Sequence, residues 1–185
     1  MCRRHAAWFG WPRSWARTAR ISARRPIVAR VSCASPREVR LEETLHPVAR
    51  GRHRHMLAEH KHLVEQGAKL VELRLDYIHG PVNLRRLLAD RPCPVIVTCR
   101  RPADGGKWTD SEDARQLILR TAIAEGVEYV DLEEDVAAVV PRFGNTKRIV
   151  SLHDFRKTPL DLDDIYLRLA ALDPDVVKIS TLANH

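Results

Sequence analysis

From about residue 46 onward, short apolar segments alternate with amphipathic segments, and this alternation restricts the chain to a few folds. The apolar segments predict strands at residues 70–76, 94–100, 128–134, 148–154 and 175–180. The amphipathic segments predict helices at about 51–66, 82–90, 111–126, 134–142 and 160–173, with Gly67 placed as a C-cap and acidic residues opening the third helix. Such alternation is typical of parallel strands joined by right-handed crossovers. Two architectures fit, a doubly wound sheet and a (β/α)8 barrel.

The positions of polar residues favour the barrel. A dinucleotide-binding sheet would carry a GxGxxG turn after its first strand, and the chain has none. Instead, a polar residue stands near the carboxyl end of every predicted strand: Glu72, Arg74, Arg100, Asp131, Glu133, Ser151, His153 and Lys178. One such residue alone would indicate a strand-end salt bridge. Five successive strands with the same feature predict a shared polar site, because these ends converge in a barrel.

Lys178 is unusual because it lies inside the apolar run DVVKIS. Burial and neighbouring cations such as Arg74 or Arg100 would favour its neutral, nucleophilic amine, which can form an imine with a ketone or aldehyde. Pairing with Asp131 or Glu133, or snorkelling at the barrel mouth, would explain the lysine equally well. His153 shifts the balance towards chemistry, because an imidazole can move the proton that an imine makes acidic.

Five motifs, in this order and spacing, resemble type I 3-dehydroquinate dehydratase of the shikimate pathway: ELRLDYI, TCRRPADGG, YVDLEE, SLHDFRKTP and VVKIS. The resemblance covers about residues 46–185 and rests on SLHDFRKTP and ELRLD together, since VVKIS alone is weak. It implies an α/β fold of the (β/α)8 TIM-barrel type. It also implies a lyase that needs no cofactor and no metal, whose partner is a small molecule, 3-dehydroquinate.

The resemblance also implies a role for each matched residue. Lys178 matches the lysine that forms a Schiff base with the C3 ketone, and His153 matches the acid/base that removes a C2 proton and helps the C1 hydroxyl leave. Glu72 and Arg74 match residues that hold the substrate hydroxyls. The remaining matches are Arg100, a further site arginine; Asp104, at a position usually held by a glutamate that orients the histidine; and Asp131, an acid near the lysine.

The chain departs from the family pattern at both ends of the barrel. The first strand should lie within REVRLEETLHPVA, where Pro47 and the charges predict a weak strand. No segment matches strands seven and eight, which in the family supply the arginine that binds the substrate carboxylate, with a serine and a glutamine. We therefore expect an incomplete barrel of five to six strands that is truncated at its C-terminus. Open edges of this kind predict aggregation or a need for a partner.

The net charge of +7 comes from the N-terminal part of the chain. Residues 1–60 hold 13 arginines and four acids, whereas the remainder carries a net charge of −2. Residues 1–45 show no sustained period and predict a basic, disordered extension, with a targeting peptide or a nucleic-acid arm as alternatives. The four cysteines form no CxxC pair, so we expect reduced thiols and a cytoplasmic protein. No apolar run reaches the length of a membrane helix.

Other interpretations are weaker. His55, Glu59 and His62 share a helix face, but HExxH is absent, so a solvated face is favoured over a zinc site. Gly105 and Gly106 predict a mobile loop at the barrel mouth and not a phosphate cradle. The alternatives to the dehydratase are another imine-forming barrel enzyme and an inactive or non-enzymatic fragment, with nucleic-acid binding through the leader the weaker option. The resemblance also predicts a homodimer.

Overall fold

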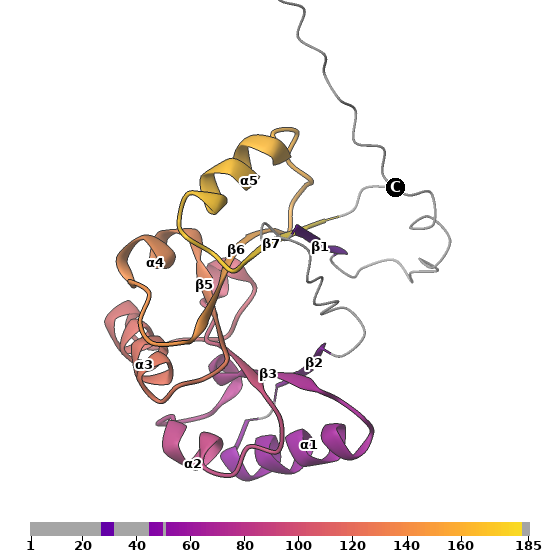
Figure 1. Cartoon of the computed structure of the whole chain (residues 1–185), viewed down its shortest axis with the longest axis vertical. Helices are drawn as coiled ribbons and strands as arrows, with labels where there is room; N and C mark the ends of the chain where they lie inside the picture. Colours follow the sequence, from indigo (N-terminus) through magenta and orange to yellow (C-terminus); the bar gives the residue numbers. More distant parts are fainter. Residues whose placement is uncertain (1–26, 32–44, 50, 183–185) are drawn as a thin grey trace, which may run out of the picture.

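The computed structural model describes residues 27–31, 45–49 and 51–182. Its seven strands form one sheet in the order β1-β7-β6-β5-β4-β3-β2 (Figure 1). The strands are β1 Ile27–Val31, β2 Leu45–Val48, β3 Leu70–Arg74, β4 Val95–Thr98, β5 Tyr129–Glu133, β6 Lys147–Asp154 and β7 Val176–Thr181. The helices are α1 His53–Glu65, α2 Leu84–Leu88, α3 Glu112–Ala124, α4 Glu134–Val139 and α5 Leu162–Ala170, with 3-10 turns at Leu75–Tyr77 and Pro102–Asp104.

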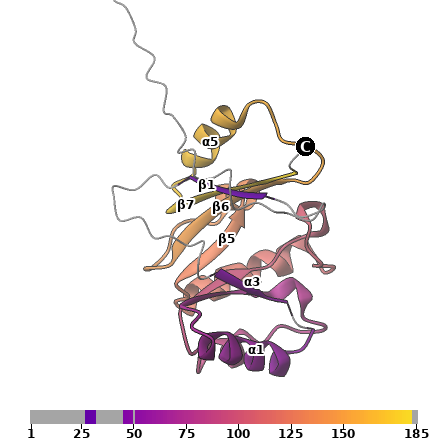
Figure 2. The same cartoon turned by 90° about the vertical axis from the view of Figure 1, so that its right-hand side faces the viewer.

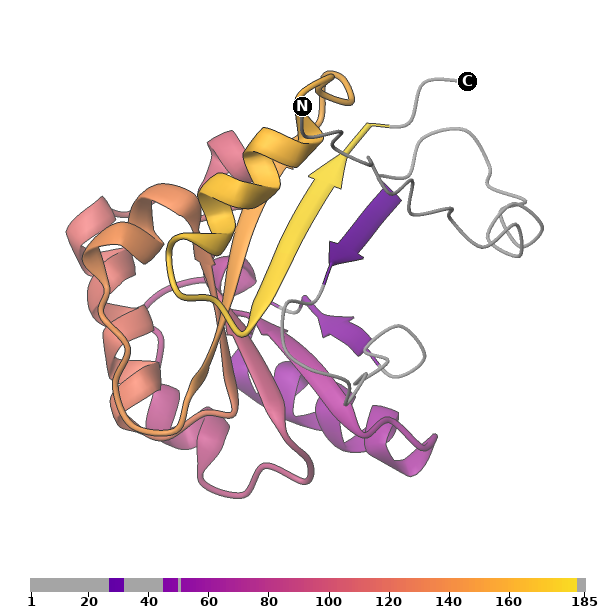
Figure 3. The same cartoon turned by 45° about the horizontal axis from the view of Figure 1, so that its top comes forward.

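Six strands, β2 to β7, lie side by side in chain order and are parallel throughout. They curl into part of a barrel, and the five helices cover its outer face (Figure 3). A doubly wound sheet would carry helices on both faces, so the described residues confirm the barrel-type α/β fold with an incomplete set of strands. Among the described residues, no helix is long and apolar enough to cross a membrane.

The two faces of the curled sheet carry different residues because side chains alternate along each strand. Outward-facing residues such as Val71, Val130 and Val150 pack with the helices in the main apolar core. The concave face begins with a small apolar cluster at the amino ends of the strands: Leu70, Ile96, Tyr129 and Ile149. Two residues further along each strand, the same face becomes polar, and this change places the candidate site.

Helix ends follow the expected capping chemistry. Gly67 has a φ of 98° directly after the C-cap of α1, a backbone conformation that glycine adopts without strain. The Ser111 side chain accepts a hydrogen bond from the Ala114 N–H at 3.2 Å, and Glu112 and Asp113 follow in the first turn of α3. These observations confirm the predicted end of α1 and start of α3.

The weak first strand is present as β2. It pairs with β3 alone and therefore forms an edge of the sheet. Pro47 has no N–H to donate, and an edge strand tolerates this because no second strand lies beside it. The alternating segment at residues 38–43 lies outside the described residues.

Five residues of the predicted N-terminal extension form a strand. β1 runs antiparallel to β7, with Arg30 opposite Lys178 in the register, and Figures 1 and 2 show the two strands side by side. The expectation of disorder therefore does not hold for Ile27–Val31. Leu45, the last residue of the predicted extension, opens β2. Residues 1–26 and 32–44 lie outside the described residues, and their lack of structure stays a prediction.

Helix α3 offers a matched test of the packing. Leu119 is fully buried, whereas Leu117 on the same helix is 65% exposed. We expect Leu119→Ala to lower the free energy of unfolding by about 2–5 kcal/mol, since it leaves a cavity, and Leu117→Ala to change it by less than about 0.5 kcal/mol. Urea titration followed by circular dichroism measures both values. Equal losses for the two variants would show that this face of α3 does not pack on the sheet.

Candidate functional site

The polar part of the concave face brings the lysine to Asp131, one of the two acids expected to pair with it, and to Glu72, whereas Glu133 pairs with Arg115. Lys178 Nζ lies 2.9 Å from Asp131 Oδ2 and 4.0 Å from Glu72 Oε1. Thr98 Oγ1 donates to the same Glu72 oxygen at 2.7 Å. The Lys178 side chain is only 12% exposed, so its ammonium group is compensated mainly by these carboxylates. The lysine is thus paired with Asp131, as one of the sequence alternatives proposed.

Asp131 is the centre of this cluster. Besides Lys178, it accepts hydrogen bonds from Arg100 at 2.7 Å and from Ser151 Oγ at 2.5 Å. Burial alone would raise the pKa of Asp131, but the charges of Arg100 and Lys178 outweigh it and hold that pKa well below its ordinary value. The carboxylate is therefore charged at neutral pH and joins donors from β6, β7 and the end of β4.

His153 sits beside this cluster, with its Nε2 facing Arg100 Nη1. Since a guanidinium only donates, Nε2 is the acceptor and Nδ1 carries the ring hydrogen. That Nδ1 atom is buried and has no hydrogen-bond partner among the described residues. Burial, followed by the charge of Arg100, lowers the pKa of His153 from 6.5 to about 3. The imidazole is thus neutral at pH 7, with its one lone pair directed at Arg100.

The structure does not bring Asp104 to His153. Asp104 pairs with Arg101 at 2.5 Å, and Arg101 also binds Asp135 at 2.7 and 2.8 Å. The carboxylate is therefore held by its neighbour three residues earlier, while the His153 Nδ1 atom is unpartnered. Sequence matching had assigned this position an orienting role, and the geometry gives no support for that contact.

Arg74 lies at the mouth of the site. Asp76 binds it through two hydrogen bonds, at 2.9 Å to Nε and 2.8 Å to Nη2, and also accepts the Lys107 N–H at 3.0 Å. The Arg74 guanidinium stands 5.0 Å from the centre of the Tyr77 ring. A fully buried carboxylate therefore fixes both a predicted substrate-binding arginine and the loop after β4.

The loop containing Gly105 and Gly106 packs against the site. A Cβ atom on Gly106 would lie 1.9 Å from the Arg100 carbonyl oxygen, which accepts the Trp108 N–H at 3.1 Å. Only glycine permits this close approach. The loop thus supports the backbone of Arg100.

Sequence reasoning missed three contributors: Thr98, Asp76 and Arg115, a buried arginine on α3 that donates to Glu133 at 2.8 Å. Thr98 could have been found from the alternation, because it lies two residues before Arg100 on the same face. Asp76 could also have been found, because it ends the predicted strand 70–76 two residues after Arg74, although the structure places it in the 3-10 turn that follows β3. Arg115 lies on a helix, so no strand periodicity points to it.

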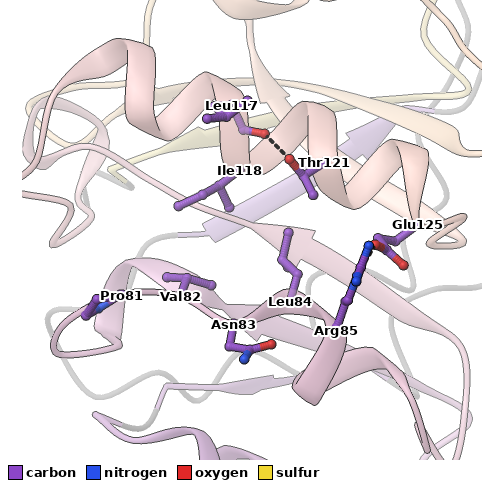
Figure 4. Close-up of a pocket in the computed structure, with 9 residues that line it drawn as sticks. All are labelled: Pro81, Val82, Asn83, Leu84, Arg85, Leu117, Ile118, Thr121 and Glu125. Carbon is purple, nitrogen blue, oxygen red and sulfur yellow. Dashed lines mark hydrogen bonds and ion pairs between the residues drawn. The ribbon is translucent and has the colours of Figure 1, made fainter.

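A separate groove of about 580 Å³ lies on the outer surface between α2 and α3 (Figure 4). Leu84, Leu117 and Ile118 contribute to its wall, and it does not include the polar residues of the concave face.

Among the described residues, no group of His, Cys, Asp and Glu is placed to hold a metal ion. His60 and Cys93 come close, with 3.2 Å between the His60 Nε2 and Cys93 Sγ atoms, but they are two residues and not a group of three.

Comparison with known proteins agrees with this arrangement. The model of the type I 3-dehydroquinase family matches residues 46–185. The chain belongs to this family. The resemblance found in the sequence is thereby confirmed.

The relatives are longer than the matched chain. A 3-dehydroquinate dehydratase of Methanothermobacter thermautotrophicus is 38% identical over 131 residues, which cover 66% of this chain and 58% of that protein. The bifunctional 3-dehydroquinate dehydratase/shikimate dehydrogenase of Arabidopsis thaliana is 34% identical over 139 residues, covering 69% of this chain and 23% of that protein. The solved 3-dehydroquinate dehydratase of Geobacillus kaustophilus superimposes with a TM-score of 0.65 at 21% identity, covering 74% of this chain and 60% of the other. That likeness shows the fold.

The lowered pKa of His153 predicts a pH dependence of stability. An unfolded histidine binds a proton as the pH falls below 6.5, whereas the folded protein resists protonation until about pH 3. Stability should therefore fall as the pH drops from 7 to 4.5, and His153→Gln should reduce that loss. Urea midpoints at the two pH values measure it, with the exposed His62→Gln as control. An unchanged pH dependence in His153→Gln would contradict the neutral, buried imidazole.

Proposed function

We propose that this chain carries the imine-forming centre of a type I 3-dehydroquinate dehydratase, which converts 3-dehydroquinate to 3-dehydroshikimate. The observation that carries the proposal is the cluster of Lys178, Asp131, Arg100 and His153 on the concave face. Asp131, His153 and Lys178 lie on β5, β6 and β7, and Arg100 lies in the segment after β4. Hydrogen bonds join Lys178 to Asp131, Asp131 to Arg100 and Arg100 to His153. The family match supports 3-dehydroquinate as the substrate of this cluster.

Imine formation begins at Lys178. Its ammonium group must give up a proton before the amine attacks the C3 ketone of the substrate. The resulting carbinolamine then loses water and forms a protonated imine. Asp131 stabilises the positive charge at both stages, because it stays ionised 2.9 Å from Nζ. The charged imine withdraws electrons from C2 and makes its proton acidic.

His153 is the base for that proton and the acid for the leaving group. Its Nε2 lone pair is occupied by Arg100, so proton abstraction requires Arg100 to move from the imidazole to the substrate. The departure of this cation also raises the basicity of His153, because Arg100 is one cause of its low pKa. The protonated imidazole then donates to the C1 hydroxyl, which leaves as water, and hydrolysis of the imine releases the product.

Glu72 and Arg74 are proposed to hold the substrate hydroxyls. Glu72 Oε1 lies 4.0 Å from Lys178 Nζ, and Arg74 is fixed at the mouth by Asp76. The match covers 58% of the length of the relatives from Methanothermobacter thermautotrophicus and Methanopyrus kandleri, and the carboxylate-binding arginine of the family pattern has no match in the chain. A cytoplasmic location and a homodimer stay predictions.

Borohydride trapping tests the proposal. The purified chain is incubated with 3-dehydroquinate, reduced, and examined by intact mass and peptide mapping. We expect an adduct on Lys178, and its loss in Lys178→Met. Lys147→Met is the matched control, since Lys147 lies at the opposite, amino end of β6 and should leave the adduct unchanged.

The absence of an adduct from folded protein would contradict the imine centre and favour an inactive fragment. An adduct that forms equally well with other small ketones would instead favour another imine-forming enzyme.

A further inference from the structure

Arg115 is a fully buried arginine on α3 that the proposed chemistry does not use. Its Nη1 donates to the Cys99 carbonyl at 2.7 Å and to Glu133 Oε2 at 2.8 Å. Its Nε and Nη2 bind Glu112 at 2.9 and 2.8 Å. The guanidinium thus holds the peptide unit directly before Arg100 and the last residue of β5.

Glu133 competes with Asp131 for the same cation. Its second oxygen lies 3.9 Å from Arg100 Nε, which is buried and makes no hydrogen bond among the described residues. Arg100 therefore stands between two carboxylates and binds Asp131, at 2.7 Å. Arg115 satisfies Glu133 from the other side, and this leaves Arg100 on Asp131 and His153.

We propose that Arg115 is a positioning residue, which holds Glu133 so that the Arg100 guanidinium stays on Asp131 and His153. This role rests on the proposed function, because its use is to keep Arg100 beside the imine centre. Without Arg115, Glu133 becomes a buried carboxylate whose nearest described cation is Arg100. Arg100 then turns towards Glu133, and both Asp131 and His153 lose a donor.

Burial raises the pKa of Glu133 in spite of the opposing charge of Arg115. Around His153, the charged groups are Arg100 after β4, Asp131 on β5, Lys178 on β7 and Arg74 on β3. Of these, Arg100 lowers the pKa of His153 most after burial itself. The titration of His153 is therefore a reporter of where Arg100 lies, and it needs neither substrate nor activity.

The experiment follows the His153 imidazole by NMR from pH 8 to pH 2, a range that includes the wild-type midpoint near pH 3, with the signal assigned by its loss in His153→Gln. We expect Arg115→Met to raise the His153 midpoint by about one pH unit or more, the typical effect of losing a nearby charge. Arg115→Met/Glu133→Gln should return it to the wild-type position, because the competing carboxylate is gone. The control is Arg120→Met on the same helix, whose arginine binds only the Val139 carbonyl in the described structure and should leave the midpoint unchanged.

Three outcomes overturn the proposal: an unchanged midpoint in folded Arg115→Met, an equal shift in Arg120→Met, or a double variant that stays shifted like the single one. If Arg115→Met does not fold, Arg115→Lys decides. Lysine keeps the charge but cannot reproduce the fork of contacts, so a smaller upward shift supports positioning and no shift overturns it.

Borohydride trapping provides a second measurement. The rate of adduct formation on Lys178 should fall about tenfold or more in Arg115→Met and recover in the double variant. A wild-type chain that forms no adduct would sink the proposed function, while the titration of His153 would still decide the role of Arg115.

Discussion

The buried carboxylate of Asp131 is the interaction on which the polar site depends. One anion receives Lys178, Arg100 and Ser151, and these donors come from β7, from the segment after β4 and from β6. A charge in such a position is tolerated only when partners surround it, and removing one partner of a buried pair commonly costs about 3–5 kcal/mol. The same contacts that stabilise Asp131 therefore hold the strand ends in register around the lysine.

This arrangement has a chemical corollary. The strongest contacts around Lys178 already join protein donors to protein acceptors, since Asp131 binds Lys178, Arg100 and Ser151, and Glu72 accepts from Thr98. A substrate that enters must replace some of these contacts with contacts to its own ketone and hydroxyls. If Arg100 turns to the substrate, the pKa of His153 rises, because Arg100 is one cause of its low value. Binding and activation of the base are coupled through Arg100, because this one guanidinium bridges the carboxylate and the imidazole.

Much of the fold and of the site could be predicted from periodicity. Residues two apart share a strand face, so Glu72, Asp131 and Lys178 were expected on one surface, and the structure places them there. Helix-borne residues escape that logic, and Arg115 reaches the site from α3. The partner of Asp104 could not be predicted from the sequence either. Arg101 and His153 are both plausible donors, and only the conformation of the 3-10 turn Pro102–Asp104 shows that Asp104 pairs with Arg101. β1 was missed because an isolated five-residue strand shows too few repeats to establish a period.

The antiparallel pairing of β1 with β7 has a kinetic consequence. β7 can accept only one neighbour on its outer side, and the backbone of Ile27–Val31 occupies that position. A second polypeptide that extended the sheet beyond β7 would first have to displace β1. The rate of such an assembly would then be limited by a unimolecular opening within one chain, and above a threshold concentration it would cease to depend on how much partner is supplied.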